Sequence, residues 1–166
     1  MTRAAVWKQL KGVEALGVKL NRIRGRGYRI VGGLDLLDVE AIQRQLPELT
    51  PPFNVQLHMS IPSTNQTLMQ RQQQQSIHGE VVLAEVQTAG RGRLGRQWQS
   101  PFGQNVALSL GWNFSGGAAA LEGLSLVVGL ALAKALSDLG VQEVKLKWPN
   151  DILVDGKKLA GILLEM

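Results

Sequence analysis

The segment Gly90–Trp98, with the sequence GRGRLGRQW, holds three glycines and three arginines within positions 90–96. Glycine lets the backbone approach a ligand closely, and guanidinium groups offer forked donors that match a carboxylate or a phosphate. Trp98 adds a flat face on which a base or a cation can stack. The pattern predicts a loop that becomes ordered over an anionic ligand. The alternative is a basic surface loop that binds nothing.

The same segment contains the spacing G-x-G-x-x-G, which is typical of dinucleotide-binding folds. That function requires a helix to begin within the motif, because the pyrophosphate binds at the helix N-terminus. Here Gln97–Gly103 has the composition of a loop that leads into a strand, and the Lys-Ser/Thr pair of a P-loop is missing. The sequence therefore argues against a dinucleotide-binding or P-loop site.

A second group of polar residues lies in Lys147–Asp151, with the sequence KWPND, and in Gly156–Gly161, with the sequence GKKLAG. Asn150 and Asp151 offer the hard oxygen ligands that hold magnesium beside a nucleotide phosphate. Lys158 is a point charge suited to a phosphate or a developing oxyanion. The structural alternative is that these residues only form turns, for which their types are well suited.

Ser63-Thr64-Asn65-Gln66 has the pattern of a helix start, and the N–H groups of such a start also suit a carboxylate. His58 and His78 lack neighbouring ligand residues, so we expect neither a zinc site nor a histidine-based triad.

A chain of 166 residues with 45% apolar composition is long enough for about one domain with a packed core. The absence of cysteine excludes a disulfide scaffold, a thiolate metal site and a cysteine nucleophile, and it fits a reducing compartment. The N-terminus lacks the apolar centre of a signal peptide, and polar residues interrupt the apolar stretch Leu121–Leu136. We therefore expect a soluble, cytoplasmic protein with no membrane contact.

The formal net charge of +5 is unevenly distributed. Residues 1–34 carry eight Lys/Arg and one acid, whereas residues 35–166 carry ten Lys/Arg and twelve acids. A compact basic segment indicates a polyanionic partner such as DNA, and the alternative is a solvated basic face.

The elements that position these residues follow from periodicity and caps. The basic segment predicts a helix capped by Thr2, a hairpin around Arg24–Gly27, and a short helix capped by Asp38. Residues 49–52 mark the entry to a region of alternating strands and helices. There we expect strands over 54–59, 80–86, 105–112, 141–148 and 159–166, helices over 63–74 and 118–139, and a hairpin turn at 155–156. The fold class is α/β (α+β).

The three motifs, in this order, resemble the signatures of the biotin protein ligases. The basic segment resembles the winged-helix domain of the bacterial members that also repress the biotin operon. The resemblance implies a partial winged helix (recognition helix and wing) over 1–33, a connecting helix and linker over 34–52, and a truncated catalytic domain with a mixed sheet over 53–166. Because the family's catalytic domain continues further and its winged helix begins earlier, both ends look cut, and we expect a fragment.

The resemblance also implies a reaction. Biotin and ATP, with Mg²⁺, give biotinyl-5'-adenylate, and a lysine of the biotin carboxyl carrier protein of acetyl-CoA carboxylase then accepts the biotin. The implied partners are that carrier protein, operator DNA, and a second copy of the chain when adenylate is bound. Two alternatives stay open: a DNA-binding repressor only, and a lipoate–protein ligase of the same fold.

The resemblance assigns roles to individual residues. Catalysis is expected of Lys158 and Arg93. The expected biotin contacts are Ser63, Thr64, Asn65, Gln87, Arg91, Gly92, Arg93 and Lys158. The expected adenylate contacts are Gly90, Gly95, Arg96 and Trp98, with Asp151 and Asn150 as magnesium ligands. The expected DNA contacts are Arg3, Lys8, Lys11, Arg24 and Arg26.

Overall fold

A computed structural model describes residues 2–48, 52–115, 117 and 121–166. The helices are α1 (Arg3–Ala15), α2 (Val39–Gln45), α3 (Thr64–Gln72) and α4 (Leu124–Asp138), with a 3₁₀ turn η1 (Arg93–Gly95). The strands are β1 (Leu20–Ile23), β2 (Gly27–Ile30), β3 (Asn54–His58), β4 (Glu80–Ala84), β5 (Ala107–Leu110), β6 (Val144–Lys147), β7 (Asp151–Val154) and β8 (Lys157–Gly161). The mixed α/β class is confirmed.

The chain divides into two compact units, which are described separately. The first comprises residues 1–91 and 97–112, and the second comprises residues 92–96 and 113–166. The predicted boundaries at 33 and 52 stay a prediction. Residues 49–51, where we placed part of the entry to the catalytic domain, lie outside the described residues.

The start of the first unit follows the predicted caps. Thr2 Oγ1 accepts a hydrogen bond from Ala5 N at 3.3 Å and begins α1, and Asp38 Oδ1 accepts one from Ala41 N at 3.1 Å and begins α2. Between the helices, β1 and β2 pair as an antiparallel hairpin in which Leu20 lies opposite Ile30. The predicted helix, hairpin and short helix are confirmed.

The remainder of the first unit is a three-stranded mixed sheet in the order β3-β4-β5. Strands β3 and β4 are parallel and are joined by α3, whereas β5 is antiparallel to β4. Leu68 of α3 packs with Ile77 and with Val82 of β4, and Ile61 borders this cluster. This packing of α3 against the sheet fixes the position of the first turn of α3, which follows the end of β3.

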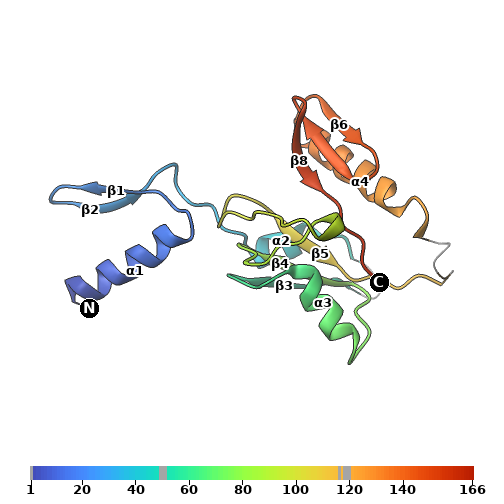
Figure 1. Cartoon of the computed structure of the whole chain (residues 1–166), viewed down its shortest axis with the longest axis horizontal. Coiled ribbons are helices and arrows are strands. Elements are labelled where there is room, and N and C mark those ends of the chain that lie inside the picture. Colours follow the sequence, from blue (N-terminus) through green and yellow to red (C-terminus); the bar gives the residue numbers. More distant parts are fainter. Residues whose placement is uncertain (1, 49–51, 116, 118–120) are drawn as a thin grey trace. The chain divides into compact units, whose positions relative to one another are not determined.

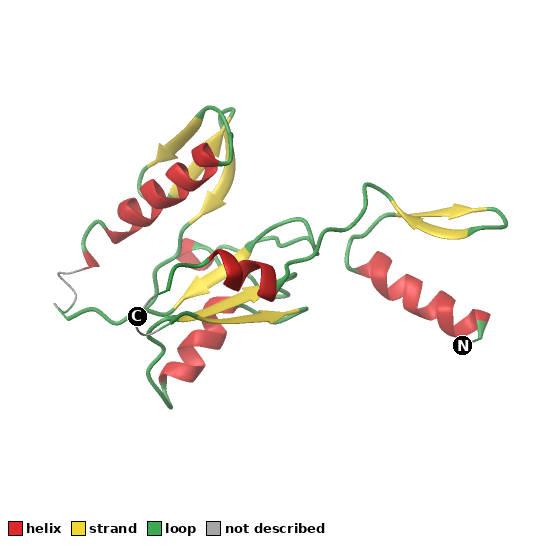
Figure 2. Ribbon diagram, turned by 180° about the vertical axis from the view of Figure 1, so that it is seen from behind, coloured by secondary structure: helices red, strands yellow, loops and turns green. Residues whose placement is uncertain are grey.

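The second unit is an antiparallel sheet in the order β6-β7-β8, with α4 against β6 and β7 (Figure 1, and from behind in Figure 2). Gly129 in the middle of α4 allows a close approach, because a Cβ there would lie 3.3 Å from Leu146 Cδ2 and 3.5 Å from Ile162 Cδ1. The opposite side of α4 leaves Val127 and Leu130 each 61% exposed.

Two predicted elements of the second unit differ from the structure. The last strand is β8 (Lys157–Gly161) rather than 159–166, because the turn at Asp155–Gly156 sets a register in which Gly161 pairs with Asp151, the first residue of β7. Strand β7 itself was not predicted. Helix α4 begins at Leu124 rather than at 118, and residues 118–120 lie outside the described part of the chain.

The other predicted strands are present but shorter, with bounds at 54–58, 80–84, 107–110 and 144–147. No helix in the described part of the chain is long and apolar enough to cross a membrane.

Candidate functional site

The N-terminal turn of α3 places three of the predicted biotin contacts at one point. Ser63 caps the helix, since its Oγ accepts a hydrogen bond from Gln66 N at 3.4 Å. Ser63 and Thr64 are each only 3% exposed, and Asn65 is half-buried. A polar N-terminus buried in this way needs partners for its donors and acceptors.

Gln87 supplies one of those partners. Its Oε1 accepts hydrogen bonds from Thr64 N at 2.8 Å and from Thr64 Oγ1 at 3.0 Å. The backbone after β4 runs beside Ile61, where Thr88 N donates to Ile61 O at 2.9 Å. The structure therefore brings Gln87 to the start of α3, as the resemblance implies.

Two serines that the sequence analysis did not identify complete this arrangement. Ser109 of β5 donates to Thr64 Oγ1 at 2.8 Å and also contacts Asn65 Oδ1. Ser100 Oγ accepts from Gln87 N at 3.2 Å and donates to Asn105 Oδ1 at 2.9 Å. The signal for Ser109 was available, because it is a polar residue at an inward-facing position of an alternating strand. Ser63, Thr64, Asn65, Gln87 and Ser109 are called the α3 polar cluster below.

The base of the glycine- and arginine-rich loop belongs to the first unit. Trp98 N donates to Gly90 O at 2.8 Å, and Arg91 pairs with Gln97 in an isolated antiparallel bridge. Gly90 is buried, and a Cβ there would lie 2.7 Å from Trp98 O. A larger residue at position 90 would therefore clash with Trp98 at the point where the two ends of the loop meet.

The tip of the loop belongs to the second unit. Gly92 N donates to Arg96 O at 2.7 Å, and Leu94 and Gly95 have φ values of 58° and 70°. The tip contains a single 3₁₀ turn rather than the start of a helix, which confirms that the motif is not a dinucleotide-binding turn. Arg93 and Arg96 are exposed, and Leu94 is 90% exposed.

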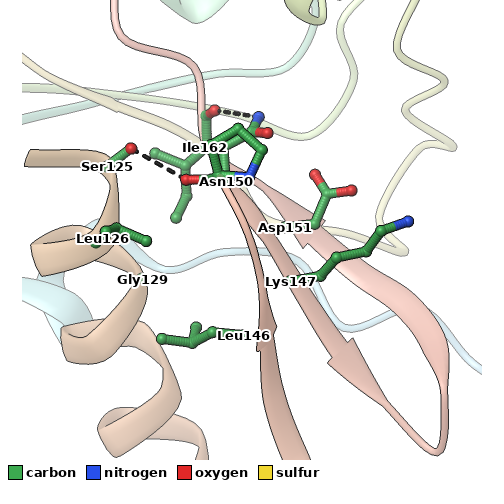
Figure 3. Close-up of a pocket in the computed structure, with 9 residues that line it drawn as sticks. Ser125, Leu126, Gly129, Leu146, Lys147, Asn150, Asp151 and Ile162 are labelled. Carbon is green, nitrogen blue, oxygen red and sulfur yellow. Dashed lines mark hydrogen bonds between the residues drawn. The ribbon is translucent and has the colours of Figure 1, made fainter. Parts of the chain in front are cut away.

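The turn between β6 and β7 holds Asn150 through three contacts. Asn150 Nδ2 donates to Ile162 O at 2.8 Å, Ile162 N donates to Asn150 O at 2.9 Å, and Arg93 Nη1 donates to Asn150 Oδ1 at 3.3 Å. Ser125 Oγ of α4 also donates to Pro149 O at 3.1 Å (Figure 3). Asn150 therefore joins the turn to the segment after β8.

Lys158 and Asp151 are brought together by the β7–β8 pairing. Lys158 Nζ lies 2.7 Å from Asp151 Oδ1, and the lysine side chain is 43% exposed while that of the aspartate is 19% exposed. Within the described ranges, no group of three or more His, Cys, Asp or Glu side chains could hold a metal ion. One carboxylate at this place fits a magnesium ion that is held mainly by phosphate oxygens, rather than a site made by protein alone.

An ion pair between Glu143 and Lys145 lies at the start of β6. A hydrogen bond from Lys145, 2.9 Å away, and the charge of that lysine lower the pKa of Glu143. The same hydrogen bond and the charge of Glu143 raise the pKa of Lys145. Both side chains are exposed.

The expected DNA contacts lie on α1 and on the β1–β2 turn. Arg3 is the first residue of α1, Lys8 and Lys11 are exposed on that helix, and Arg24 and Arg26 are exposed in the turn. Lys11 Nζ lies 5.4 Å from the centroid of the Trp7 ring, and that ring lies 6.2 Å from the ring of Tyr28 in β2. The aromatic contact joins the helix to the hairpin.

Neither histidine has metal-ligand neighbours among the described residues. His78 packs against Trp112 with ring centroids 4.1 Å apart and the ring planes tilted by 50°. His58 is on β3, and its Nε2 is buried without a hydrogen-bond partner in the described part of the chain.

Comparison with known proteins identifies the family to which these residues belong. Residues 57–166 match the model of the Biotin/lipoate A/B protein ligase family. The chain belongs to this family. The matched range contains the α3 polar cluster, the loop Gly90–Trp98 and Lys158.

Curated relatives extend the similarity over the whole chain. It is 43% identical over 166 residues to the bifunctional ligase/repressor BirA of Salmonella typhimurium, covering 100% of this chain and 50% of that protein. It is 50% identical over 86 residues to the biotin–[acetyl-CoA-carboxylase] ligase of Paracoccus denitrificans, covering 51% of this chain and 35% of that protein. The chain thus spans about half the length of the BirA relative.

A solved structure of the biotin protein ligase from Aquifex aeolicus, in complex with biotin and ATP, matches with a TM-score of 0.58 and 34% identity. That match covers 68% of this chain and 47% of the other. The biotin protein ligase from Leishmania major in complex with biotin matches with a TM-score of 0.60 and 31% identity, covering 68% of this chain and 51% of the other. These likenesses confirm the ligase-type fold.

Proposed function

We propose that the chain carries the biotin-activating site of a biotin–protein ligase. The observation that supports this most directly is the α3 polar cluster, which offers neutral donors and acceptors in a buried place. The ureido ring of biotin has N–H and C=O groups that can pair with such a cluster. The dithiolane ring of lipoate has neither, and it would leave buried polar groups unpaired at a cost in free energy. The cluster therefore favours biotin over lipoate.

In the first step, a carboxylate oxygen of biotin attacks the α-phosphorus of ATP. A P–O bond forms between the two, the bond from the α-phosphorus to the α,β-bridging oxygen breaks, and pyrophosphate departs with that oxygen to leave biotinyl-5'-adenylate. The charge at the reacting atoms is negative throughout, so cations and positioning are the main requirements. We assign Lys158 and Arg93 to stabilising the carboxylate and the α-phosphate, with Arg91 and the backbone of Gly92 completing the contacts to biotin.

The adenylate is assigned to the glycine- and arginine-rich loop. Trp98 offers a half-buried ring for the adenine, and Gly90, Gly95 and Arg96 line the loop around the phosphate. Magnesium, which screens the phosphate charge when bound, would be held by Asp151 and by ATP oxygens. Asn150 is proposed as a second ligand through its Oδ1, and its hydrogen bonds with Arg93 and Ile162 also hold the turn.

In the second step, the ε-amine of a lysine on a biotin carboxyl carrier protein attacks the acyl carbon. An amide bond forms and AMP leaves. The acceptor is proposed on the names of the relatives, among them the biotin–[acetyl-CoA-carboxylase] ligase of Paracoccus denitrificans.

Exchange of labelled pyrophosphate into ATP by the full-length protein that contains this chain tests the activation step. We expect exchange that depends on biotin, is not supported by lipoate, and is lost in Lys158→Met. Exchange with lipoate but not with biotin would show that biotin is not the substrate.

A second function, DNA binding, is favoured by the exposed cations of α1 and the β1–β2 turn. The BirA relatives are named ligase/repressors, and in this proposal the adenylate-bound chain dimerises on operator DNA. Replacing Arg24 and Arg26 together by alanine should weaken binding to a duplex of the biotin operator and flatten its salt dependence, as measured by fluorescence anisotropy. An unchanged salt dependence would remove the β1–β2 turn from the DNA contact.

A further inference from the structure

Ser109 lies in an unusual place for a hydroxyl group. In β5, Ala107 and Ser109 point inward, whereas Leu108 and Leu110 are exposed. Ser109 is 6% exposed, and a buried hydroxyl is costly unless it is hydrogen-bonded. Its proton is shared between Thr64 Oγ1 at 2.8 Å and Asn65 Oδ1, so both of its partners lie in the first turn of α3.

The orientation of the Gln87 amide can be assigned from its partners. A backbone N–H can only donate, so the Gln87 atom that lies 2.8 Å from Thr64 N is the oxygen. The Thr64 hydroxyl accepts a hydrogen bond from Ser109 and donates one to the same Gln87 oxygen at 3.0 Å. Both lone pairs of Gln87 Oε1 are then occupied, and the NH₂ end is the part of the amide that can donate to a ligand.

The NH₂ end of Gln87 lies beside the loop. A Cβ on Gly90 would lie 3.3 Å from Gln87 Nε2, so the absence of a side chain at position 90 leaves room there. The Gln87 NH₂ group is thus a hydrogen-bond donor at this point. A ligand that binds there needs an acceptor, such as the ureido oxygen of biotin.

We propose that Ser109 is a positioning residue for biotin recognition: by occupying the acceptor side of Thr64 Oγ1, it directs the Thr64 proton to Gln87 and keeps the Gln87 NH₂ group facing the ligand. The inference rests on the proposed biotin function. Without the Ser109 hydroxyl, the Thr64 hydroxyl can rotate, and Gln87 is held by the Thr64 backbone N–H alone.

The test compares two ligands that differ at the atom in question. Biotin carries a ureido oxygen, and 2-iminobiotin carries an imino nitrogen, which is a donor when protonated. Binding of each to the full-length protein that contains this chain is measured by calorimetry at a pH where 2-iminobiotin is protonated. For Ser109→Ala we expect biotin affinity to fall about fivefold to tenfold, the range of one neutral hydrogen bond, with little change for 2-iminobiotin.

Ser109→Thr keeps the hydroxyl and should restore the preference for biotin. Ser137→Ala, an exposed serine on α4, is the matched control and should change neither affinity. Ser109→Cys is similar in size to the wild-type side chain but has a thiol, which is a weaker hydrogen-bond donor than a hydroxyl. It provides a second measurement if Ser109→Ala does not fold. It should give an intermediate preference.

The outcomes separate the two proposals. If the wild-type chain binds neither ligand, the proposed function fails and this inference fails with it. If wild type binds biotin but the Ser109→Ala and Ser109→Cys variants lose both ligands equally, or lose neither, Ser109 is only a packing residue and the inference is wrong.

Discussion

Lys158 Nζ lies 2.7 Å from Asp151 Oδ1, so the residue assigned to the reacting anions is held by the residue assigned to the metal. The contact results from the β7–β8 pairing, in which a register shift between Ile152 and Leu153 sets Lys158 opposite Leu153. The carboxylate is the more buried partner, and the ammonium remains accessible to a ligand. Because Lys158 is partly exposed, the pair contributes little to stability, and its value lies in placing the positive charge.

The first prediction concerns this charge. Lys158→Met should lower the rate of biotinyl-adenylate formation about 100-fold to 1,000-fold, the usual loss when one group that stabilises transition-state charge is removed. The midpoint of thermal unfolding should change little, because an exposed pair is lost. Lys157→Met, on the same strand, is the matched control and should keep the wild-type rate. Equal rates for the two variants would contradict the role of Lys158.

The second prediction concerns the loop arginine. Arg93 makes one exposed hydrogen bond, to Asn150 Oδ1 at 3.3 Å, so Arg93→Ala should leave the thermal midpoint unchanged. Losing one charge-assisted contact to the adenylate should weaken its binding by about 2–3 kcal/mol and speed its release. Release is followed by the chase of labelled adenylate with unlabelled ligand. Leu94→Ala, in the same loop, should release the adenylate at the wild-type rate, and a similar effect in both variants would indicate a general loosening of the loop.

Local signals in the sequence predicted the starts of α1, α2 and α3 correctly, but not the start of α4. Thr2, Asp38 and Ser63 each accept the backbone hydrogen bond that a cap requires, and the donor is in each case the residue three positions further along the chain. Likewise Asp155-Gly156 is a turn because of its own residue types, with φ values of 49° and 72°.

Contacts between distant segments could not be predicted in the same way. The end of β8 depends on where β7 begins, because Gly161 pairs with Asp151. Ser109 belongs to the candidate site only because β5 pairs with β4 and lies against α3, a relationship that spans more than 40 residues. The motif residues were identifiable because they are close in sequence, whereas the residues that hold them are not.

The third prediction uses two glycines of one loop that differ in available space. In Gly90→Ala the new Cβ would meet Trp98 O at 2.7 Å, whereas in Gly92→Ala the nearest atom, Arg96 O, would be 3.5 Å away. We expect Gly90→Ala to break the Gly90–Trp98 backbone hydrogen bond and to cost about 1–3 kcal/mol of stability. Gly92 has φ −114°, which alanine adopts readily, so Gly92→Ala should be as stable as wild type.

Hydrogen exchange at the Trp98 amide gives a local measurement for this pair of variants. Protection of that amide should be lost in Gly90→Ala and kept in Gly92→Ala. If both variants protect the amide equally, the close approach at position 90 does not hold the base of the loop.

The last prediction concerns Glu85, a carboxylate that is 1% exposed at the end of β4. Its Oε1 accepts a hydrogen bond from Leu37 N at 2.7 Å, and its backbone oxygen accepts one from Gly103 N at 3.2 Å. Leu34 and Leu36 pack on Gly103, where a Cβ would lie 2.5 Å from Leu34 Cδ1. Glu85 therefore fastens the segment before α2 to the sheet, two residues before Gln87.

Glu85→Ala should leave the half-buried Leu37 N–H without this acceptor and lower the free energy of unfolding by about 1–3 kcal/mol. Glu85→Gln keeps an amide oxygen for that N–H and should lose less, and Glu122→Ala, an exposed acid, should lose almost nothing. Urea unfolding gives the three values, and hydrogen exchange at the Leu37 amide reports the contact itself. Wild-type protection of that amide in Glu85→Ala would show that another group accepts its hydrogen bond and that Glu85 does not hold this segment.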